Sequence, residues 1–446
     1  MRQTIRRTAL TTEVVQRRSF EVHQHRFKNG LRLLLVENPT LPTISANASV
    51  MTGSRYDPED KAGLALMVSR LLDEGTQTRS SLEIAEAIET VGGAIETDGS
   101  YERIVVSVGV LKKDVDLALD LLADLLLRPI FPPEYIDKEK QRTLSEIASA
   151  KDRPQVVAGW AFNELVYGKH PLHRPSHGYP HTVERITRQD LIEFHERYFV
   201  PNNTVLSIVG DFRVSELIPK IDKELSAWET KATAFPKYEP VERQTERRTK
   251  KISMPAEQVN LYLGHLGIER SNPDYYALQI LDTILGSGAG FTARIPHRLR
   301  DELGLAYTTY ASITMTAGQD PGRFVAFIGT SPENMERAHE ELIAEIRRAV
   351  REPVTAEELQ DAKDFLTGSF VFAFETSGQI ARFLVHAEIY GLGFDYPDRY
   401  PEFIKRVTVE EVSRVARKYL DADNYTLVVV GPTENKEAMA DGLVSY

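Results

Sequence analysis

The hydrophobic positions of this chain follow two periods, one typical of strands and one typical of helices. A nearly continuous apolar run follows the turn signal Asn29-Gly30, which predicts a β-hairpin. Strands are expected at 31–36, 43–51 and 104–110, and helices at 81–91 and from about 113 to 127. This mixture of helices, strands and hairpin signals predicts an α+β fold.

A segment in the second half of the chain repeats a segment of the first half at a constant distance. Four residues recur 221 positions apart, in the pairs Thr187/Thr408, Tyr198/Tyr419, Asn203/Asn424 and Gly210/Gly431. Each copy predicts an N-capped helix, a polar turn and a β-rich strand. Because one offset is kept through both a helix and a strand, we expect an internal repeat and hence two domains of like architecture.

Length and local composition indicate where these domains begin and end. A chain of 446 residues exceeds what a single hydrophobic core usually organises. Residues 229–251 are rich in Lys, Arg, Glu and Pro and have little hydrophobic periodicity, which predicts a linker. We therefore expect an N-terminal arm at 1–24, a first domain at 25–228 and a second domain at 252–440.

The overall composition excludes several classes of function. The formal charge of −11 argues against a nucleic-acid partner, which would require a basic surface. The absence of cysteine excludes disulfides, thiolate metal sites and thiol nucleophiles. The apolar run at 117–127 contains two aspartates and is too short to cross a bilayer, so no transmembrane segment is expected. We expect a soluble protein, with the bacterial periplasm and the cytoplasm both left open.

The stretch from Gly53 to Thr76 combines a helical pattern with residues that cannot bind a metal. At its centre stand Leu66-Met67-Val68-Ser69-Arg70. Leucine offers no lone pair, and the guanidinium of arginine stays protonated and has no acceptor atom. Ser69 cannot replace a carboxylate base. Periodicity alone predicts an amphipathic helix, and its core-facing residues are Leu64, Met67, Val68, Leu71 and Leu72.

Two glutamates farther along the chain complete a family pattern. Glu139 and Glu146 are seven residues apart, close to two helical turns, so both carboxylates are expected on one helix face. The pitrilysin-type zinc peptidases, or inverzincins, resemble this chain in the E-x6-E spacing and in the frame around Leu66–Arg70, which consists of Gly53-Ser54-Arg55, Pro58, Gly63-Leu64-Ala65 and Gly75-Thr76. Their H-x-x-E-H signature provides two zinc-binding histidines and a glutamate that polarises water. The resemblance makes Leu66, Ser69, Arg70, Glu139 and Glu146 a degenerate zinc site, with no metal expected in this chain.

Two features of the second half carry the same resemblance. Gly286, Gly288 and Gly290 resemble the glycine-rich loop of the pitrilysin family, and no G-K-[ST] follows them to indicate a phosphate-binding loop. Arg300 and Tyr307 are expected to flank a corner between a helix and a strand. In the family, an arginine and a tyrosine at this spacing come from the half opposite the zinc. There they reach the bound peptide and the tetrahedral oxyanion.

The departures from the family pattern fall on the metal ligands and the base, while the resemblance extends from about Phe27 to Pro432. Such a chain is similar to the partner subunit of two-subunit pitrilysin-family peptidases, with two α/β-sandwich-like domains as in the mitochondrial processing peptidase. The resemblance implies a non-catalytic, substrate-binding subunit that supplies Arg300 and Tyr307 in trans to an H-x-x-E-H partner, which would hold the zinc.

This chain alone is expected to cleave no peptide. Two alternatives stay open. One is a structural scaffold like the core proteins of respiratory complexes, and the other is a peptide-binding homodimer without catalysis. Neither the substrate nor the partner can be identified from the sequence.

The loss of the histidines leaves an electrostatic problem at the degenerate zinc site. If the two helices meet, the carboxylates of Glu139 and Glu146 lack the cation that would offset their charge, and unpaired buried charge is costly. Arg70 stands at the position of the second histidine of the signature. We predict that its guanidinium pairs with Glu146, Glu139 or both.

Overall fold

The first half of the chain is organised around a six-stranded sheet. The computed structural model describes residues 20–288 and 293–432. The strands of the first sheet are β1 (His23–Arg26), β2 (Arg32–Glu37), β3 (Thr43–Val50), β4 (Ala94–Gly99), β5 (Ile104–Leu111) and β6 (Thr204–Gly210). Their order across the sheet is β1-β2-β6-β3-β5-β4. β2 and β6 run parallel, and the other neighbouring pairs are antiparallel.

The second half has a five-stranded sheet of the same plan. Its strands are β7 (Arg248–Ser253), β8 (Val259–Leu266), β9 (Thr308–Ser312), β10 (Arg323–Thr330) and β11 (Thr426–Gly431). Their order is β7-β11-β8-β10-β9, with one parallel pair, β7 and β11, followed by three antiparallel pairs. The first sheet shows the same succession from β2 to β4. The predicted α+β class with two like-built halves is therefore confirmed.

The helices are distributed over the two halves in a similar way. In the first half they are α1 (Leu64–Arg70), α2 (Ser81–Thr90), α3 (Val115–Leu127), α4 (Pro133–Lys151), α5 (Pro154–Tyr167), α6 (Pro180–Arg185), α7 (Arg188–Tyr198) and α8 (Val214–Leu225). In the second half they are α9 (Tyr275–Asp282), α10 (Arg294–Pro296), α11 (Met335–Arg351), α12 (Ala356–Ser369), α13 (Ser377–Ile389), α14 (Tyr396–Arg406) and α15 (Val409–Tyr419). Two π-helical segments, Thr283–Ser287 and His297–Glu302, follow α9 and α10.

The segments that recur in the sequence form the same unit in both halves. The hydroxyl oxygen of Thr187 accepts the backbone N–H of Asp190 at the start of α7, and that of Thr408 accepts the N–H of Glu411 at the start of α15. Such caps satisfy backbone donors that a helix leaves unpaired at its first turn. Each helix then leads into one strand of the parallel pair of its sheet, β6 in the first half and β11 in the second.

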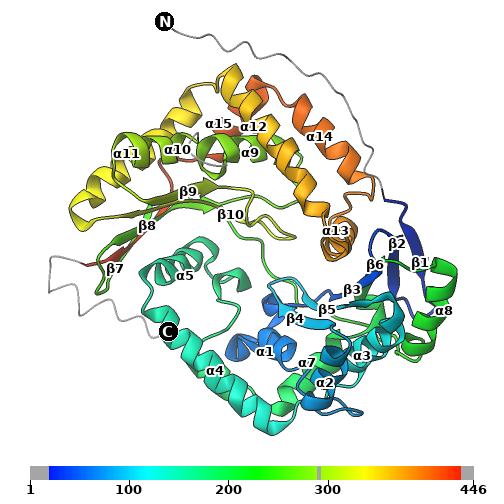
Figure 1. Cartoon of the computed structure of the whole chain (residues 1–446). Coiled ribbons are helices and arrows are strands. Elements are labelled where there is room, and N and C mark those ends of the chain that lie inside the picture. Colours follow the sequence, from blue (N-terminus) through cyan, green and yellow to red (C-terminus); the bar gives the residue numbers. More distant parts are fainter. Residues whose placement is uncertain (1–19, 289–292, 433–446) are drawn as a thin grey trace, which may run out of the picture.

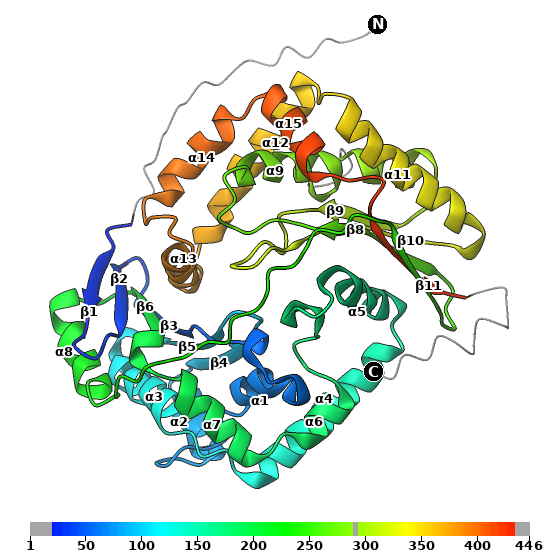
Figure 2. The ribbon, with the colours of Figure 1, turned by 180° about the vertical axis from the view of Figure 1, so that it is seen from behind.

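Each half contributes one helix to the sheet of the other half. Helix α5 packs against β8 and β11, where Phe162 shares a core with Tyr262 and Val428. Helix α13 packs against β3 and β6, and the Ser207 hydroxyl donates to the carbonyl oxygen of Ala381 at 2.8 Å. Figures 1 and 2 show the two sheets on opposite sides of the molecule, with α5 and α13 between them and most other helices outside. The two halves therefore interlock.

Most predicted elements are confirmed, and one boundary differs. The hairpin at Asn29-Gly30 joins β1 and β2, and the strands predicted at 31–36, 43–51 and 104–110 are β2, β3 and β5. Strand β7, however, begins at Arg248, inside the predicted linker 229–251. It lies at the edge of its sheet, where alternate side chains remain exposed, so a polar sequence can still form a strand.

The ends of the predicted domains are only partly described. Residues 1–19 of the predicted arm and 433–440 of the predicted second domain lie outside the described residues. Among the residues that are described, no helix combines the length and the apolar character needed to cross a bilayer.

Candidate functional site

Helix α1, which carries the degenerate motif, is held at its start by a buried aspartate. Asp57 accepts the backbone N–H groups of Gly63 and Ala65 at 2.8 and 2.9 Å. Gly63 has a φ of +103°, which favours glycine, and a β-carbon there would lie 2.7 Å from the carbonyl oxygen of His177. Burial raises the pKa of Asp57 to about 7. These contacts fix where α1 begins.

The segment that follows α1 is fixed to α3. The hydroxyl of Thr76 donates to Oδ2 of Asp124 at 2.6 Å, and Asp124 is fully buried. Gly75 precedes this contact with a φ of +141°, a conformation that other residues rarely adopt. Gly75 and Thr76, the last two residues of the frame around Leu66–Arg70, therefore anchor α1 to its own half.

The two faces of α1 have different surroundings. All the predicted core-facing residues are buried, and they are Leu64, Met67, Val68, Leu71 and Leu72. Leu66 and Arg70 lie on the other face and are half-buried. Ser69 is buried, and its hydroxyl donates to the carbonyl oxygen of Leu66 at 2.8 Å. Strand β4 approaches here, because a β-carbon on Gly99 would lie 2.7 Å from the Ser69 hydroxyl oxygen.

Arg70 bridges the two glutamates of α4, which confirms the predicted pairing. Its Nη1 donates to Oε1 of Glu139 and to Oε2 of Glu146, each at 2.9 Å. The Glu139 side chain is 7% exposed and that of Glu146 is 38% exposed, so the first carboxylate depends most on this partner. Both glutamates lie on one face of α4, as their seven-residue spacing predicted. The guanidinium therefore supplies a fixed positive charge between them.

Arg142 completes this cluster, although no role was predicted for it. Its Nε donates to Oε1 of Glu146 at 3.1 Å, and its Nη1 lies 3.6 Å from Oε2 of Glu139. Its position, three residues after Glu139 and four before Glu146, is the sequence signal that could have revealed it. Burial raises the pKa of Glu146, but the hydrogen bonds and charges of Arg70 and Arg142 outweigh burial and hold that pKa below its usual range.

These residues do not fit a zinc ion. Leu66 has no lone pair, and Arg70 carries only donors. The carboxylates of Glu139 and Glu146 are already bonded to guanidinium groups. Over 20–288 and 293–432, no cluster of three or more His, Asp or Glu side chains is arranged to hold a metal ion.

In the second half, glycines allow a helical segment to pack closely on the edge strand β9. A β-carbon on Gly286 would lie 2.3 Å from the backbone nitrogen of Ala311 in β9. On Gly288 it would lie 2.5 Å from the carbonyl oxygen of Thr283. Gly290, the third predicted glycine of this loop, lies outside the described residues. The first two glycines thus have a packing reason that is independent of any ligand.

Arg300 and Tyr307 lie on either side of the predicted helix-to-strand corner. Arg300 is in the π-helical segment His297–Glu302, and its Nε donates to Oδ1 of Asp301 at 2.9 Å. Gly304 then turns the chain with a φ of +62°, and β9 begins directly after Tyr307. The Tyr307 side chain is 87% exposed, so its ring and hydroxyl are available to a molecule outside the chain.

The predicted site residues therefore fall into two groups in different halves. Arg70, Glu139 and Glu146 come together beside the first core, which includes the buried face of α1. Arg300 and Tyr307 lie beside the second core, which includes Leu299, the residue directly before Arg300.

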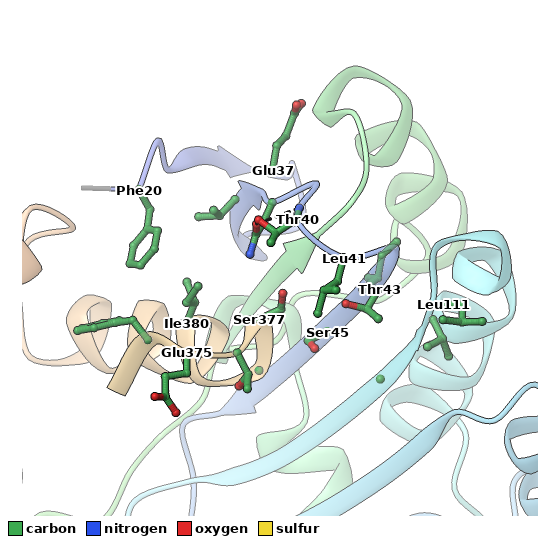
Figure 3. Close-up of a pocket in the computed structure, with 18 of the residues that line it drawn as sticks. Phe20, Glu37, Thr40, Leu41, Thr43, Ser45, Leu111, Glu375, Ser377 and Ile380 are labelled. Atoms are coloured by element: carbon green, nitrogen blue, oxygen red, sulfur yellow. Dashed lines mark hydrogen bonds between the residues drawn. The ribbon is translucent and has the colours of Figure 1, made fainter. Parts of the chain in front are cut away.

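A cavity of about 830 Å³ lies between the first sheet and α13, away from both groups. Figure 3 shows Thr43 and Ser45 of β3 on one side of it and Ser377 and Ile380 of α13 on the other. Its described lining contains none of the predicted site residues.

Two family models match the chain in succession. Residues 32–178 match the model described as Insulinase (Peptidase family M16). Residues 185–366 match the model described as Peptidase M16 inactive domain. Together they cover most of both halves.

Similar proteins align over nearly the whole chain. A Bacillus subtilis protein named uncharacterized zinc protease YmxG is 27% identical over 415 residues, which is 93% of this chain and 99% of that protein. An uncharacterized zinc protease of Mycobacterium leprae is 27% identical, with 95% and 94% of the two chains covered.

Solved structures show the same fold. A peptidase M16 inactive domain from Pseudomonas fluorescens has a TM-score of 0.86 and 28% identity, covering 93% of this chain and 98% of that one. A protease from Helicobacter pylori has a TM-score of 0.86 at 21% identity, covering 93% and 100%.

Proposed function

The chain belongs to peptidase family M16, and we propose that it is the non-catalytic, substrate-binding subunit of a heterodimeric zinc peptidase of that family. The observation that carries the proposal is the Arg70 guanidinium, which bonds to both Glu139 and Glu146 at 2.9 Å. A cation fixed there offsets the charge that a metal would otherwise offset. The site is therefore satisfied within the chain and has no ligands left for zinc.

The second half supports a role toward a molecule outside the chain. In the proposed complex, Arg300 and Tyr307 act in trans at the active site of an H-x-x-E-H partner, which supplies the zinc. A guanidinium can bind carbonyl oxygens in a forked geometry, and a tyrosine hydroxyl can donate to a developing oxyanion. The 87% exposure of Tyr307 supports this assignment, since a group that acts in trans must be accessible.

Peptide binding would use the sheet edges near these residues. Strands β4 and β9 each lie at the end of their sheet, so one side of each backbone has no neighbouring strand within 20–288 and 293–432. An extended peptide can pair with such an edge through main-chain hydrogen bonds. The glycine-rich segment with Gly286 and Gly288 packs directly on β9 and, with Gly290, is proposed to border the peptide.

We also interpret the like-built halves as an internal repeat.

The test is to measure zinc content and peptide cleavage for the purified chain, alone and mixed with an H-x-x-E-H protein of family M16 from the same organism. We expect no stoichiometric zinc and no cleavage by the chain alone, and cleavage after mixing. Zinc-dependent cleavage by this chain alone, after contamination has been excluded, would contradict the proposal. A partner that is fully active by itself would also contradict it.

Two other functions can be distinguished with the same purified proteins. Light scattering that shows a dimer of this chain alone, with peptide binding but no response to a partner, would favour the peptide-binding homodimer. Co-purification within a membrane complex that contains no H-x-x-E-H subunit would favour the structural scaffold.

A further inference from the structure

A second cavity, of about 820 Å³, lies beside the first half and has a lining unlike that of the degenerate zinc site. It is bordered by the segment before α1, by the loop that follows α5, by the end of α7 and by residues of the segment between the halves. Rings on its walls belong to Tyr56, Tyr198 and Tyr238. A volume of this size is within the range of small-molecule sites, about 300 to 1,000 Å³.

A buried arginine lines this cavity without a full set of partners. Arg174 is 6% exposed, and its Nε is buried with no hydrogen-bond partner among the described residues. The residue is anchored through its backbone, because its carbonyl oxygen accepts the Tyr101 hydroxyl. Leaving a guanidinium donor buried and unpaired is costly, so such a group is expected to meet an acceptor that is not part of the chain.

The nearby carboxylate is engaged elsewhere. Asp57 also lines the cavity, but its oxygens accept the backbone N–H groups of Gly63 and Ala65. The other acidic side chain of the lining is Glu59, which is exposed. The histidine of the lining, His173, has a pKa that burial lowers, so it adds no charge at neutral pH.

Two further cations lie in the lining. Lys169 is exposed, and Arg197 is held with its guanidinium over the Tyr198 ring at 5.2 Å while its Nη2 donates to the carbonyl oxygen of Ala234 at 2.7 Å. The lining contains three cationic and two acidic side chains, and one of the acidic ones, Asp57, is only partly ionised at neutral pH because burial raises its pKa to about 7. The lining therefore carries a net positive charge of between one and two, which suits an anion.

We propose that this cavity binds a carboxylate ligand that carries an aromatic ring. The Arg174 guanidinium receives the carboxylate, because its planar fork matches the two oxygens of that group. Arg197 and Lys169 add positive charge at the opening, and the rings of Tyr56 and Tyr238 pack against the aromatic part of the ligand.

The test is calorimetric titration of the full chain with N-acetyltyrosine, with N-acetyltyrosinamide and with inorganic phosphate. We expect saturable binding of N-acetyltyrosine, at least about tenfold tighter than either of the other two probes. The amide keeps the ring and removes the charge, whereas phosphate keeps a charge and removes the ring. Equal binding of the amide, tighter binding of phosphate, or no saturable binding of N-acetyltyrosine would overturn the proposal.

Variants locate the site. Arg174→Gln should weaken N-acetyltyrosine binding by about tenfold or more, while Arg213→Gln, which removes an exposed cation paired with Glu37, should leave it unchanged. If Arg174→Gln fails to fold, Tyr238→Ala and Arg197→Gln provide the same test at the wall and the opening. Unchanged binding in folded Arg174→Gln, or in both of the other variants, would exclude this cavity as the site.

Discussion

The two halves build the same contact between a helical segment and an edge strand, but they leave its polar residues in opposite states. In the first half α1 packs on β4, with Gly99 against Ser69, and in the second half a π-helical segment packs on β9, with Gly286 against Ala311. Arg70 beside the first contact is bonded to two carboxylates. Tyr307 beside the second contact is 87% exposed.

This difference shows how one architecture can close a site or keep it open. The first site contains carboxylates that are costly to bury alone, so a cation from the same chain is required there. The second site presents a phenol whose exposure needs no compensation, so the chain can leave it for another molecule. Four experiments can break or sharpen this contrast.

The largest effect is expected from reopening the first site. In the double variant Leu66→His/Arg70→His, two imidazoles stand one helical turn apart and Glu146 loses its main cationic partner. We expect zinc content to rise from none to about one ion per chain, measured by elemental analysis after dialysis. Leu66→His alone, which keeps Arg70, should bind no zinc. If the double variant also binds none, the first site is not a zinc site that Arg70 has closed.

The next effect concerns the open site and rests on the proposed function. Arg300→Ala and Tyr307→Phe should each lower turnover of the assembled peptidase by about 100-fold, the usual cost of removing one oxyanion donor. The complex should still form, as measured by size-exclusion chromatography. Phe372→Ala, which removes another exposed ring of the second half, is the matched control and should keep normal turnover. Normal turnover in both site variants would remove their assigned role.

A smaller effect is expected from opening the closed site without a replacement cation. Arg70→Ala leaves Glu139 nearly buried beside Glu146, and should lower the free energy of unfolding by about 2 kcal/mol, between the values for exposed and fully buried pairs. Urea denaturation measures it. Arg142→Ala removes a side chain that is 60% exposed, and should cost less than about 1 kcal/mol. An equal loss in both variants would mean that Arg70 is not the central cation.

The smallest effect is the pH dependence of this same contribution. Because the pKa of Glu146 is lower in the folded chain than in the unfolded chain, its stabilising contribution is fully present above about pH 4.5. It is lost as the pH falls through the lowered pKa. The difference in unfolding free energy between the natural chain and Arg70→Ala should therefore shrink at acidic pH. A difference that stays constant down to pH of about 3 would show that Glu146 does not titrate with this pair.

Much of the fold and one interaction of the candidate site follow from the sequence alone. Apolar runs, alternating patterns and helical patterns located β2, β3, β5, α2 and α3, because each of these elements buries at least one face. The spacing of Glu139 and Glu146, with Arg70 where a ligand would stand, was enough to predict their pairing. Charge that must be compensated is a strong constraint, and it can be read from residue types.

Only the tertiary structure decided how the halves interlock and which other residues join the site. Helix α5 has apolar residues on more than one face, and its partner surface belongs to β8 and β11 of the other half. Strand β7 looks like a linker until its parallel pairing with β11 is known. The contact of Thr76 with Asp124 also becomes known only from the tertiary structure, because it joins residues 48 positions apart. Local periodicity reports which face of an element is buried, but the surface that covers it comes from distant chain segments, of the same half or of the other half, that meet only in the folded structure.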